Sequence, residues 1–205
     1  MSANAKLEKL YCRDNQLTAI DTRNNPELLE LSIENNQIGG VDVSRNPKLR
    51  LLFCVNNKIS ALDVSSNTAI ISLDCSANQI TALDVRKNTA MTMLQCKGDK
   101  LETLDVSHNT ALEVLVCAYN QLTVLNVSNN SKLYQLDCSC NQLSVLNVAS
   151  NTLLTELYCY GNSLTTIDVS KNPALVGLNC SNNSLTALDV SRNSSLVKLY
   201  WTTTT

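Results

Sequence analysis

Cysteine has the most reactive side chain in this sequence, and its spacing is regular. The 205-residue chain contains nine cysteines, and eight of them lie 21 residues, or a multiple of 21, apart. These eight are Cys12, Cys54, Cys75, Cys96, Cys117, Cys138, Cys159 and Cys180. Zinc needs clustered thiolates such as C-x-x-C, whereas the nearest approach is Cys138-Ser139-Cys140, and the odd count argues against a complete disulfide framework. We expect the regular cysteines to be reduced and buried, and the irregular Cys140 to be exposed and reactive.

Carboxylates recur with the same spacing. One column holds Asp seven times and Asn twice: Asp21, Asp42, Asp63, Asp84, Asp105, Asn126, Asn147, Asp168 and Asp189. Such a file of oxygens could bind Ca²⁺, but a cation site needs several oxygens that converge on one point. The two Asn indicate that the side-chain oxygen matters more than its charge. We expect a structural role, with cation binding as the alternative.

Catalytic groups are scarce. His108 is the only histidine, and other repeats carry Arg, Lys, Ser or Asn at its position. No Ser-His-Asp or Cys-His arrangement can be assembled around it from the sequence, and no phosphate-binding glycine loop is present. The sequence predicts neither an enzyme nor a cofactor or metal site.

These residues are positioned by repeats of 21 residues. Nine repeats fill residues 7–195 without insertion or deletion, followed by a partial C-terminal capping repeat at 196–201 and a tail at 202–205. The consensus is L-x-x-L-x-C-x-x-N-x-L-T-x-L-D-V-S-x-N-x-x, and positions are numbered from its first residue. Position four is always Leu, position nineteen is always Asn, and position nine is Asn except at Asp99. Residues 1–205 are therefore expected to form a single repeat domain.

The consensus resembles the leucine-rich repeat signature over nearly the whole chain. Its 21-residue length, with a nested L-x-x-L-D-V-x-x-N half, resembles the short bacterial class called IRREKO repeats. The resemblance implies a parallel β-solenoid and, usually, a binding role.

Each repeat also holds two short apolar runs, such as Leu73-Asp74-Cys75 and Leu83-Asp84-Val85, whose alternation is typical of strands. Stacked about 4.8 Å apart, the runs predict an all-β solenoid with two parallel sheets of short strands and little or no helix. Two sides of similar width predict low curvature. The Asn columns are expected at the bends, bonded to backbone groups and to each other, and Trp201 is expected to cover the end of the core.

Charge and hydropathy exclude several functions. The formal net charge is −2, which argues against nucleic-acid binding. No apolar run reaches the roughly 18 residues that span a membrane, and the N-terminus has no signal-peptide h-region, so membrane insertion is not expected.

The outward residues of the first run vary most. Position five changes from Tyr and Phe to Asp, Gln and Val, whereas the outward position of the second run is nearly constant. Exposed aromatic and apolar residues gathered on one sheet are typical of recognition, although strand propensity also favours them. The candidate partner-binding residues are Tyr11, Leu51, Phe53, Val55, Val116, Tyr119, Tyr158, Tyr160 and Tyr200.

We therefore expect a non-enzymatic binding or adhesion module, extracellular or on a bacterial surface, with a protein or glycan partner. One alternative is a structural spacer or stalk that self-associates end to end. Another is adsorption to ice, mineral or calcium through the second run.

Overall fold

The computed structural model describes residues 4–202. Within this range it contains ten three-residue strands, which form one parallel sheet in chain order. The strands are β1 (Lys9–Tyr11), β2 (Glu30–Ser32), β3 (Leu51–Phe53), β4 (Ser72–Asp74), β5 (Met93–Gln95), β6 (Val114–Val116), β7 (Gln135–Asp137), β8 (Glu156–Tyr158), β9 (Gly177–Asn179) and β10 (Lys198–Tyr200). The predicted parallel, helix-free solenoid is confirmed for these residues.

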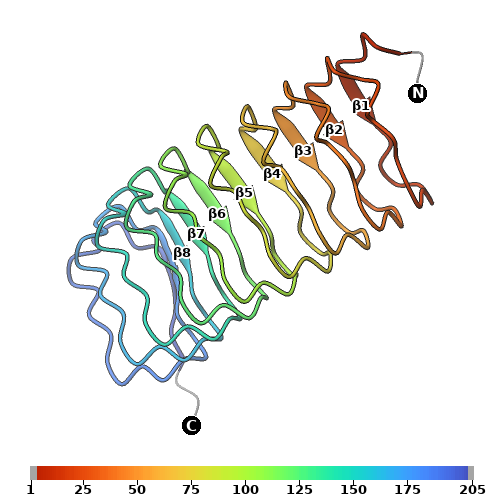
Figure 1. The fold of residues 1–205 in the computed structure, drawn as a ribbon. Helices are drawn as coiled ribbons and strands as arrows, with labels where there is room; N and C mark the ends of the chain where they lie inside the picture. Colours follow the sequence, from red (N-terminus) through yellow and green to blue (C-terminus); the bar gives the residue numbers. More distant parts are fainter. Residues whose placement is uncertain (1–3, 203–205) are drawn as a thin grey trace.

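The turns of the solenoid stack in an unbroken row (Figure 1). The turns near β1 are seen nearly edge-on and those near the C-terminus are more open to the viewer, so the stack changes direction gradually and does not close into a horseshoe. The described part contains no helix that is both long and apolar enough to span a membrane.

The register of the sheet equals the repeat length. Each strand pairs with residues 21 positions away, as in Leu10 with Leu31 and Leu94 with Leu115. The central Leu of each strand from Leu31 to Leu178 is fully buried, while its two neighbours point outward. A single three-residue strand cannot bury its apolar side chain alone, so the stability of each turn comes from packing against the turns above and below it.

The second apolar run does not form a second sheet within residues 4–202, which corrects that part of the prediction. In the run at Leu83-Asp84-Val85, the Val85 carbonyl accepts the Asn88 N–H and the Asn109 Nδ2, each at 2.9 Å. The Asp84 Oδ1 accepts the Arg86 N–H at 3.0 Å. Bends and side chains thus occupy the backbone groups that a β-ladder would need.

Leu, Ile, Val and Cys fill the core between the two sides of the solenoid. Seven cysteines in successive turns are buried, as predicted, and Cys12 in the first turn is half-buried: the buried file is Cys54, Cys75, Cys96, Cys117, Cys138, Cys159 and Cys180. Cys140 is half-buried rather than exposed. At the last described turn Leu199 and Trp201 remain 41% and 40% exposed, so Trp201 does not seal the core. Of the expected tail, Thr203 to Thr205 lie outside the described residues.

The buried cysteine file is expected to resist alkylation in the native state. Burial raises the pKa of these thiols, to about 11 at Cys180 and further at Cys75 and Cys96. Because a reagent must also reach the sulfur, only the half-buried Cys12 and Cys140 should react with a thiol reagent at pH 8 before unfolding. Counting modified thiols by mass spectrometry checks this: two sites in the native protein and nine in denaturant are expected, and rapid native labelling of Cys96 would contradict it.

The Asn side chains at position nine bridge successive turns. Asn120 Oδ1 accepts the Leu101 N–H at 3.0 Å, and Asn120 Nδ2 lies 2.8 Å from the Cys96 carbonyl and 3.1 Å from the Cys117 carbonyl. The same arrangement recurs at Asn36, Asn57, Asn78, Asn141, Asn162 and Asn183. Each amide therefore satisfies backbone groups that belong to two turns.

The Asn side chains at position nineteen also join turns, but through fewer contacts. Asn109 Nδ2 donates to the Val85 and Asn88 carbonyls, each at 2.9 Å. The interior amides thus bond to backbone carbonyls and not to each other, contrary to the prediction. In the described part of the chain the Oδ1 atom is buried without a hydrogen-bond partner at Asn67, Asn88, Asn109, Asn130, Asn151, Asn172 and Asn193.

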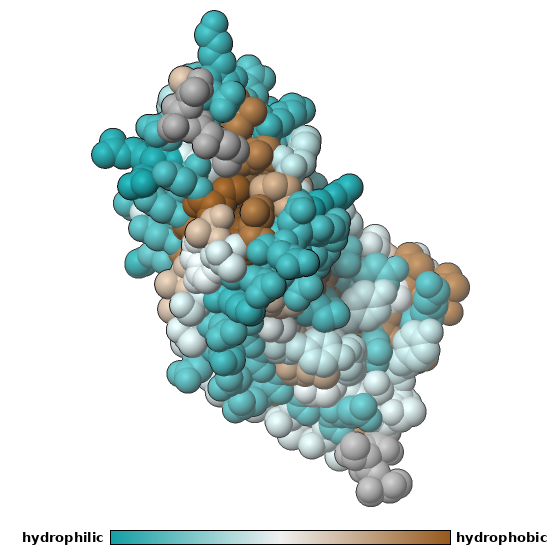
Figure 2. Space-filling model, turned by 90° about the vertical axis from the view of Figure 1, so that its right-hand side faces the viewer, coloured by the Kyte–Doolittle hydropathy of each residue, from teal (hydrophilic) through white to brown (hydrophobic). Residues whose placement is uncertain are grey.

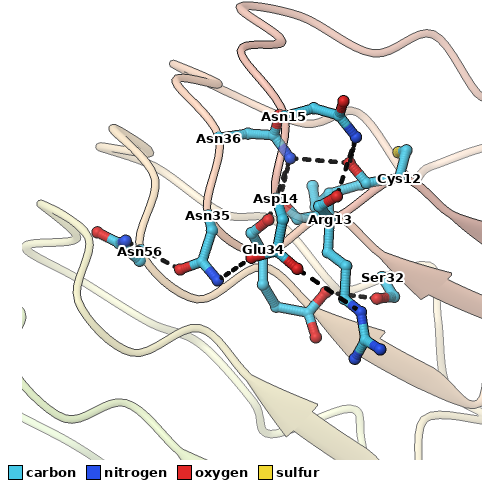
Figure 3. A network of polar contacts seen from close by, with 10 residues as sticks. Cys12, Arg13, Asp14, Asn15, Ser32, Glu34, Asn35, Asn36 and Asn56 are labelled. Carbon is cyan, nitrogen blue, oxygen red and sulfur yellow. Dashed lines mark hydrogen bonds and ion pairs between the residues drawn. The ribbon is translucent and has the colours of Figure 1, made fainter.

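Position eight adopts a left-handed backbone conformation in every repeat, with φ between 51° and 72°. The residues are Asp14, Asn35, Asn56, Ala77, Gly98, Tyr119, Cys140, Gly161 and Asn182. Gly and Asn tolerate this conformation, whereas Ala, Cys and Tyr are strained in it. Figure 3 shows how the first of these side chains connect: Asn35 donates to Asp14 at 2.7 Å, and Asn56 donates to Asn35 at 2.9 Å.

Replacing Ala77 by Asn is expected to raise the free energy of unfolding by about 1 kcal/mol. The new side chain tolerates φ of 55° and stands one turn beyond Asn56, where it can donate to the Asn56 Oδ1 as Asn56 donates to Asn35. Denaturant unfolding measures the gain. The control is Ala82→Asn, an exposed site without a positive φ, where no gain is expected; a destabilised Ala77→Asn variant would contradict the prediction.

Candidate partner-binding surface

The candidate surface is the strand face, which we define as the side chains at positions three, five and seven of each repeat together with Tyr119. Positions three and five flank the buried Leu of each strand, and position seven follows the strand, so the face runs along the whole sheet. Tyr11, Tyr119 and Tyr200 are exposed, at 59%, 47% and 56%. The other half-exposed candidates are Leu51, Phe53, Val55, Tyr158 and Tyr160.

Val116 differs from the expectation. It is 9% exposed, and its neighbours Val114 and Ala118 are 6% and 0% exposed, although all three lie on the outward side of the sheet. Val116 is therefore buried and offers little accessible area to a partner.

The first half of the strand face contains a cleft of about 420 Å³. Its walls are Tyr11, Arg13, Glu30, Ser32, Glu34 and Phe53. Lys9 lies 2.8 Å from Glu30, and the hydrogen bonds from Lys9 and Tyr11 lower the pKa of Glu30. Figure 3 shows Arg13 and Glu34 on neighbouring turns at this site. The cleft therefore combines two aromatic rings with charges of both signs, which suits a mixed polar and apolar partner.

The second half of the strand face contains a pair of tyrosines that come from repeats two turns apart. The hydroxyl groups of Tyr119 and Tyr160 are 2.7 Å apart, and their rings meet edge to face at a centroid distance of 6.5 Å. The Lys97 ammonium lies 5.2 Å from the centre of the Tyr119 ring. The hydrogen bond to Tyr119 raises the pKa of Tyr160. The pair thus fixes two large rings in one geometry before any partner arrives.

Beside this pair, Tyr158 lies on β8 and donates to Glu156 at 2.6 Å, which raises the pKa of Tyr158 to about 12. Ser139 lies on the intervening turn between Tyr119 and Tyr160 and is fully buried, with no partner for its Oγ among the described residues. The structure brings Tyr119, Tyr158 and Tyr160 together, while Tyr11, Phe53, Leu51 and Val55 form a separate group several turns away.

Several exposed apolar residues outside the strand face were not predicted. Val124 and Val145 are 71% and 73% exposed at position thirteen of adjacent repeats, and Tyr134 is 43% exposed at position two. Position thirteen is otherwise Ala, Gly or Thr, so the two valines were visible in the sequence as an exception. Figure 2 shows hydrophobic residues gathered in separate patches among hydrophilic ones.

The Asp and Asn side chains at position fifteen cap the following bend. In all nine repeats their Oδ1 accepts the N–H two residues on, at 2.8–3.1 Å. Asn126 and Asn147 make this bond as Asp does, which agrees with the predicted importance of the oxygen. Hydrogen bonds from Arg23 lower the pKa of Asp21 to about 2. Within residues 4–202 no group of three or more His, Cys, Asp or Glu is arranged to hold a metal ion.

Comparison with known proteins identifies the architecture. No protein-family model and no curated protein matches the sequence significantly, but solved structures do. The functional domain of InlJ from Listeria monocytogenes is 34% identical over 95% of this chain, with a TM-score of 0.80. The chain folds as a leucine-rich-repeat solenoid. The InlJ domain is described as including a cysteine ladder, and the present solenoid carries its own cysteine file in seven successive turns.

Two further solved structures show the same leucine-rich-repeat fold at lower identity. The internalin inlF from Listeria monocytogenes is 22% identical over 97% of this chain, with a TM-score of 0.89. A leucine-rich-repeat protein from Leptospira interrogans is also 22% identical over 97%, with a TM-score of 0.75. The solenoid described here spans 48% of the InlJ chain and 62% of each of the other two.

Proposed function

We propose that this leucine-rich-repeat solenoid is a non-enzymatic binding module that presents its strand face to a protein partner. The observation that carries the proposal is the fixed aromatic surface formed by Tyr119, Tyr158 and Tyr160. Rigid aromatic side chains lose little conformational entropy on binding and are frequent at the centres of interfaces. A surface that is already ordered binds with a smaller entropic cost.

Structural neighbours support a binding role. One plant receptor with this fold was solved in complex with CASPARIAN STRIP INTEGRITY FACTOR 2, and another in complex with RGF2. By analogy with the internalins, we place this chain in a bacterial surface or secreted protein and assign it to the short 21-residue repeat class, as one domain over residues 1–205. A glycan is the alternative ligand, because Tyr rings flanked by Asp and Glu also suit sugars.

A binding screen with three proteins tests the proposal. An array of extracellular proteins and glycans is probed with the wild type, with Tyr158→Ala/Tyr160→Ala, and with Val124→Ser/Val145→Ser, which changes exposed residues outside the strand face. Each protein is run in calcium and in chelator. We expect ligands that the tyrosine variant loses and the valine variant keeps, in both solutions, with the unfolding midpoint of each variant as the control for folding.

Other outcomes favour other functions. Binding that depends on calcium and on the Asp column would support adsorption through the second run. A protein without ligands that forms larger species at higher concentration in light scattering would support a spacer that self-associates. Either result would contradict the strand-face proposal.

A further inference from the structure

Asp99 is the only carboxylate in the position-nine column, and it lies in the interior of the stack. It is 8% exposed, like the asparagines above and below it. Its Oδ1 accepts the Ile80 N–H at 3.1 Å, which is the bond that Asn makes at this position in the other interior repeats. Asp99 therefore keeps the acceptor half of the Asn contacts.

The donor half is missing. In the preceding turn Asn78 Nδ2 lies 2.9 Å from the Cys54 carbonyl and 2.8 Å from the Cys75 carbonyl. In the following turn Asn120 Nδ2 makes the corresponding pair of contacts. The 21-residue register places Asp99 Oδ2 where that nitrogen would be, toward the Cys75 and Cys96 carbonyls. Oδ2 is buried and has no hydrogen-bond partner in the described chain.

An ionised carboxylate cannot supply the missing hydrogen-bond donor. Its oxygens only accept hydrogen bonds, so Oδ2 and the two carbonyl oxygens repel one another. A protonated carboxyl group has one O–H, which can donate to either carbonyl. The neutral acid is thus a close substitute for the Asn amide, whereas the anion is not.

The surrounding charges also disfavour the anion. The charged group that acts on Asp99 from the preceding turn is Asp74, which has the same sign. The titratable groups facing it from the core are the Cys54, Cys75 and Cys96 thiols, which burial keeps neutral. Asp99 forms no ion pair within residues 4–202. Among the described residues, the Ile80 N–H that donates to Oδ1 and the nearby Asn78 N–H favour the anion. Burial outweighs both and raises the pKa of Asp99 to about 6.

We propose that Asp99 is a proton-binding site built into the position-nine column, and that its protonation completes the column and stabilises the solenoid in mildly acidic solution. The proton comes from solvent, binds Oδ2, and is donated in a hydrogen bond to the Cys75 or Cys96 carbonyl. The same bend carries Lys97, which lies over the Tyr119 ring, so the site is next to the strand face.

The direction of the pH effect follows from the raised pKa. Between about pH 4, the usual pKa of an unfolded Asp, and about pH 6, the native state binds more protons than the unfolded state. The free energy of unfolding therefore falls as the pH rises through this window and is level above it. The lowered pKa values of the position-fifteen carboxylates act in the opposite direction and only below about pH 4.

Chemical unfolding of the full chain between pH 4.5 and 7.5 tests the proposal. The wild-type unfolding equilibrium constant is expected to rise about 10- to 100-fold across this range. Asp99→Asn should remove the rise and should be more stable than the wild type at pH 7.5. His108→Gln is the matched control, because it replaces the only histidine of the chain and leaves Asp99 in place. An equal pH dependence in the wild type and Asp99→Asn would overturn the proposal.

A second readout does not depend on stability. Side-chain carboxyl carbons are followed by NMR during a pH titration of the folded chain, and the Asp99 signal is assigned by its loss in Asp99→Asn. We expect that signal to titrate with a midpoint near pH 6, apart from the exposed carboxylates. A midpoint at the ordinary Asp value near pH 4 would overturn the proposal even if the variant is more stable.

Discussion

Replacing Asn120 by Ala is expected to lower the free energy of unfolding by about 3–5 kcal/mol. The amide accepts the Leu101 N–H and donates to the Cys96 and Cys117 carbonyls, all in the interior. Alanine leaves the buried Leu101 N–H and the Cys96 carbonyl without this partner, whereas the Cys117 carbonyl keeps its bond from Asn141 Nδ2 at 3.0 Å. Each buried group that loses its partner costs about 1–3 kcal/mol. Urea unfolding followed by circular dichroism provides the measurement.

Asn130→Ala is the matched comparison, because Asn130 also bridges turns but does so less completely. Its Nδ2 donates to the Val106 and Asn109 carbonyls, and each of these carbonyls also accepts a backbone N–H. Its own Oδ1 has no partner in the described chain, so alanine also removes a buried unpaired oxygen. A loss of only about 1–2 kcal/mol is expected. Equal losses in the free energy of unfolding for Asn120→Ala and Asn130→Ala would contradict the prediction that the position-nine hydrogen bonds contribute more to stability.

Replacing Leu115 by Ala is expected to destabilise the solenoid by about 2–5 kcal/mol. Leu115 is fully buried at the centre of β6 and pairs with Leu94 and Leu136 on either side. Alanine removes apolar contacts and leaves a cavity that three-residue strands, fixed by their neighbours, cannot fill by moving. Thermal and denaturant unfolding both measure the loss.

Leu199→Ala provides the control for this second prediction. Leu199 occupies the same repeat position in β10 but is 41% exposed. Leu199→Ala should lower the free energy of unfolding by less than about 1 kcal/mol, because a partly exposed side chain removes less apolar area from water on folding than a buried one. A large loss at Leu199 together with a small one at Leu115 would contradict the burial described here.

The repeating features of the fold could be read from the sequence, because one residue type at one position determines each of them. Leu at position four identified the inward strand residue, and the cysteine file was correctly predicted to be buried. The exchange of Asp for Asn at Asn126 correctly indicated a bond made by the side-chain oxygen. These inferences require only the 21-residue repeat length and the alternation of inward and outward side chains along a strand.

Features that depend on several side chains at once were not predictable. Within residues 4–202 the second sheet does not form, because backbone groups such as the Val85 carbonyl are already bonded within the bend and to Asn109, which no apolar pattern reveals. The burial of Val116 at an outward position of β6 runs against the alternation of a strand, which predicts an exposed side chain there. The contact between Tyr119 and Tyr160 joins residues 41 positions apart and uses a left-handed conformation at Tyr119 that sequence alone would assign to Gly or Asn.

Footprinting of a complex tests the proposed strand-face function most directly. Hydroxyl-radical labelling of the full chain, alone and bound to the strongest ligand from the array, reports the solvent exposure of individual side chains. Protection is expected at Tyr119, Tyr158 and Tyr160, with unchanged labelling of Val124 and Val145. Protection of Val124 and Val145, with the three tyrosines still labelled, would contradict the assignment of the strand face as the binding surface.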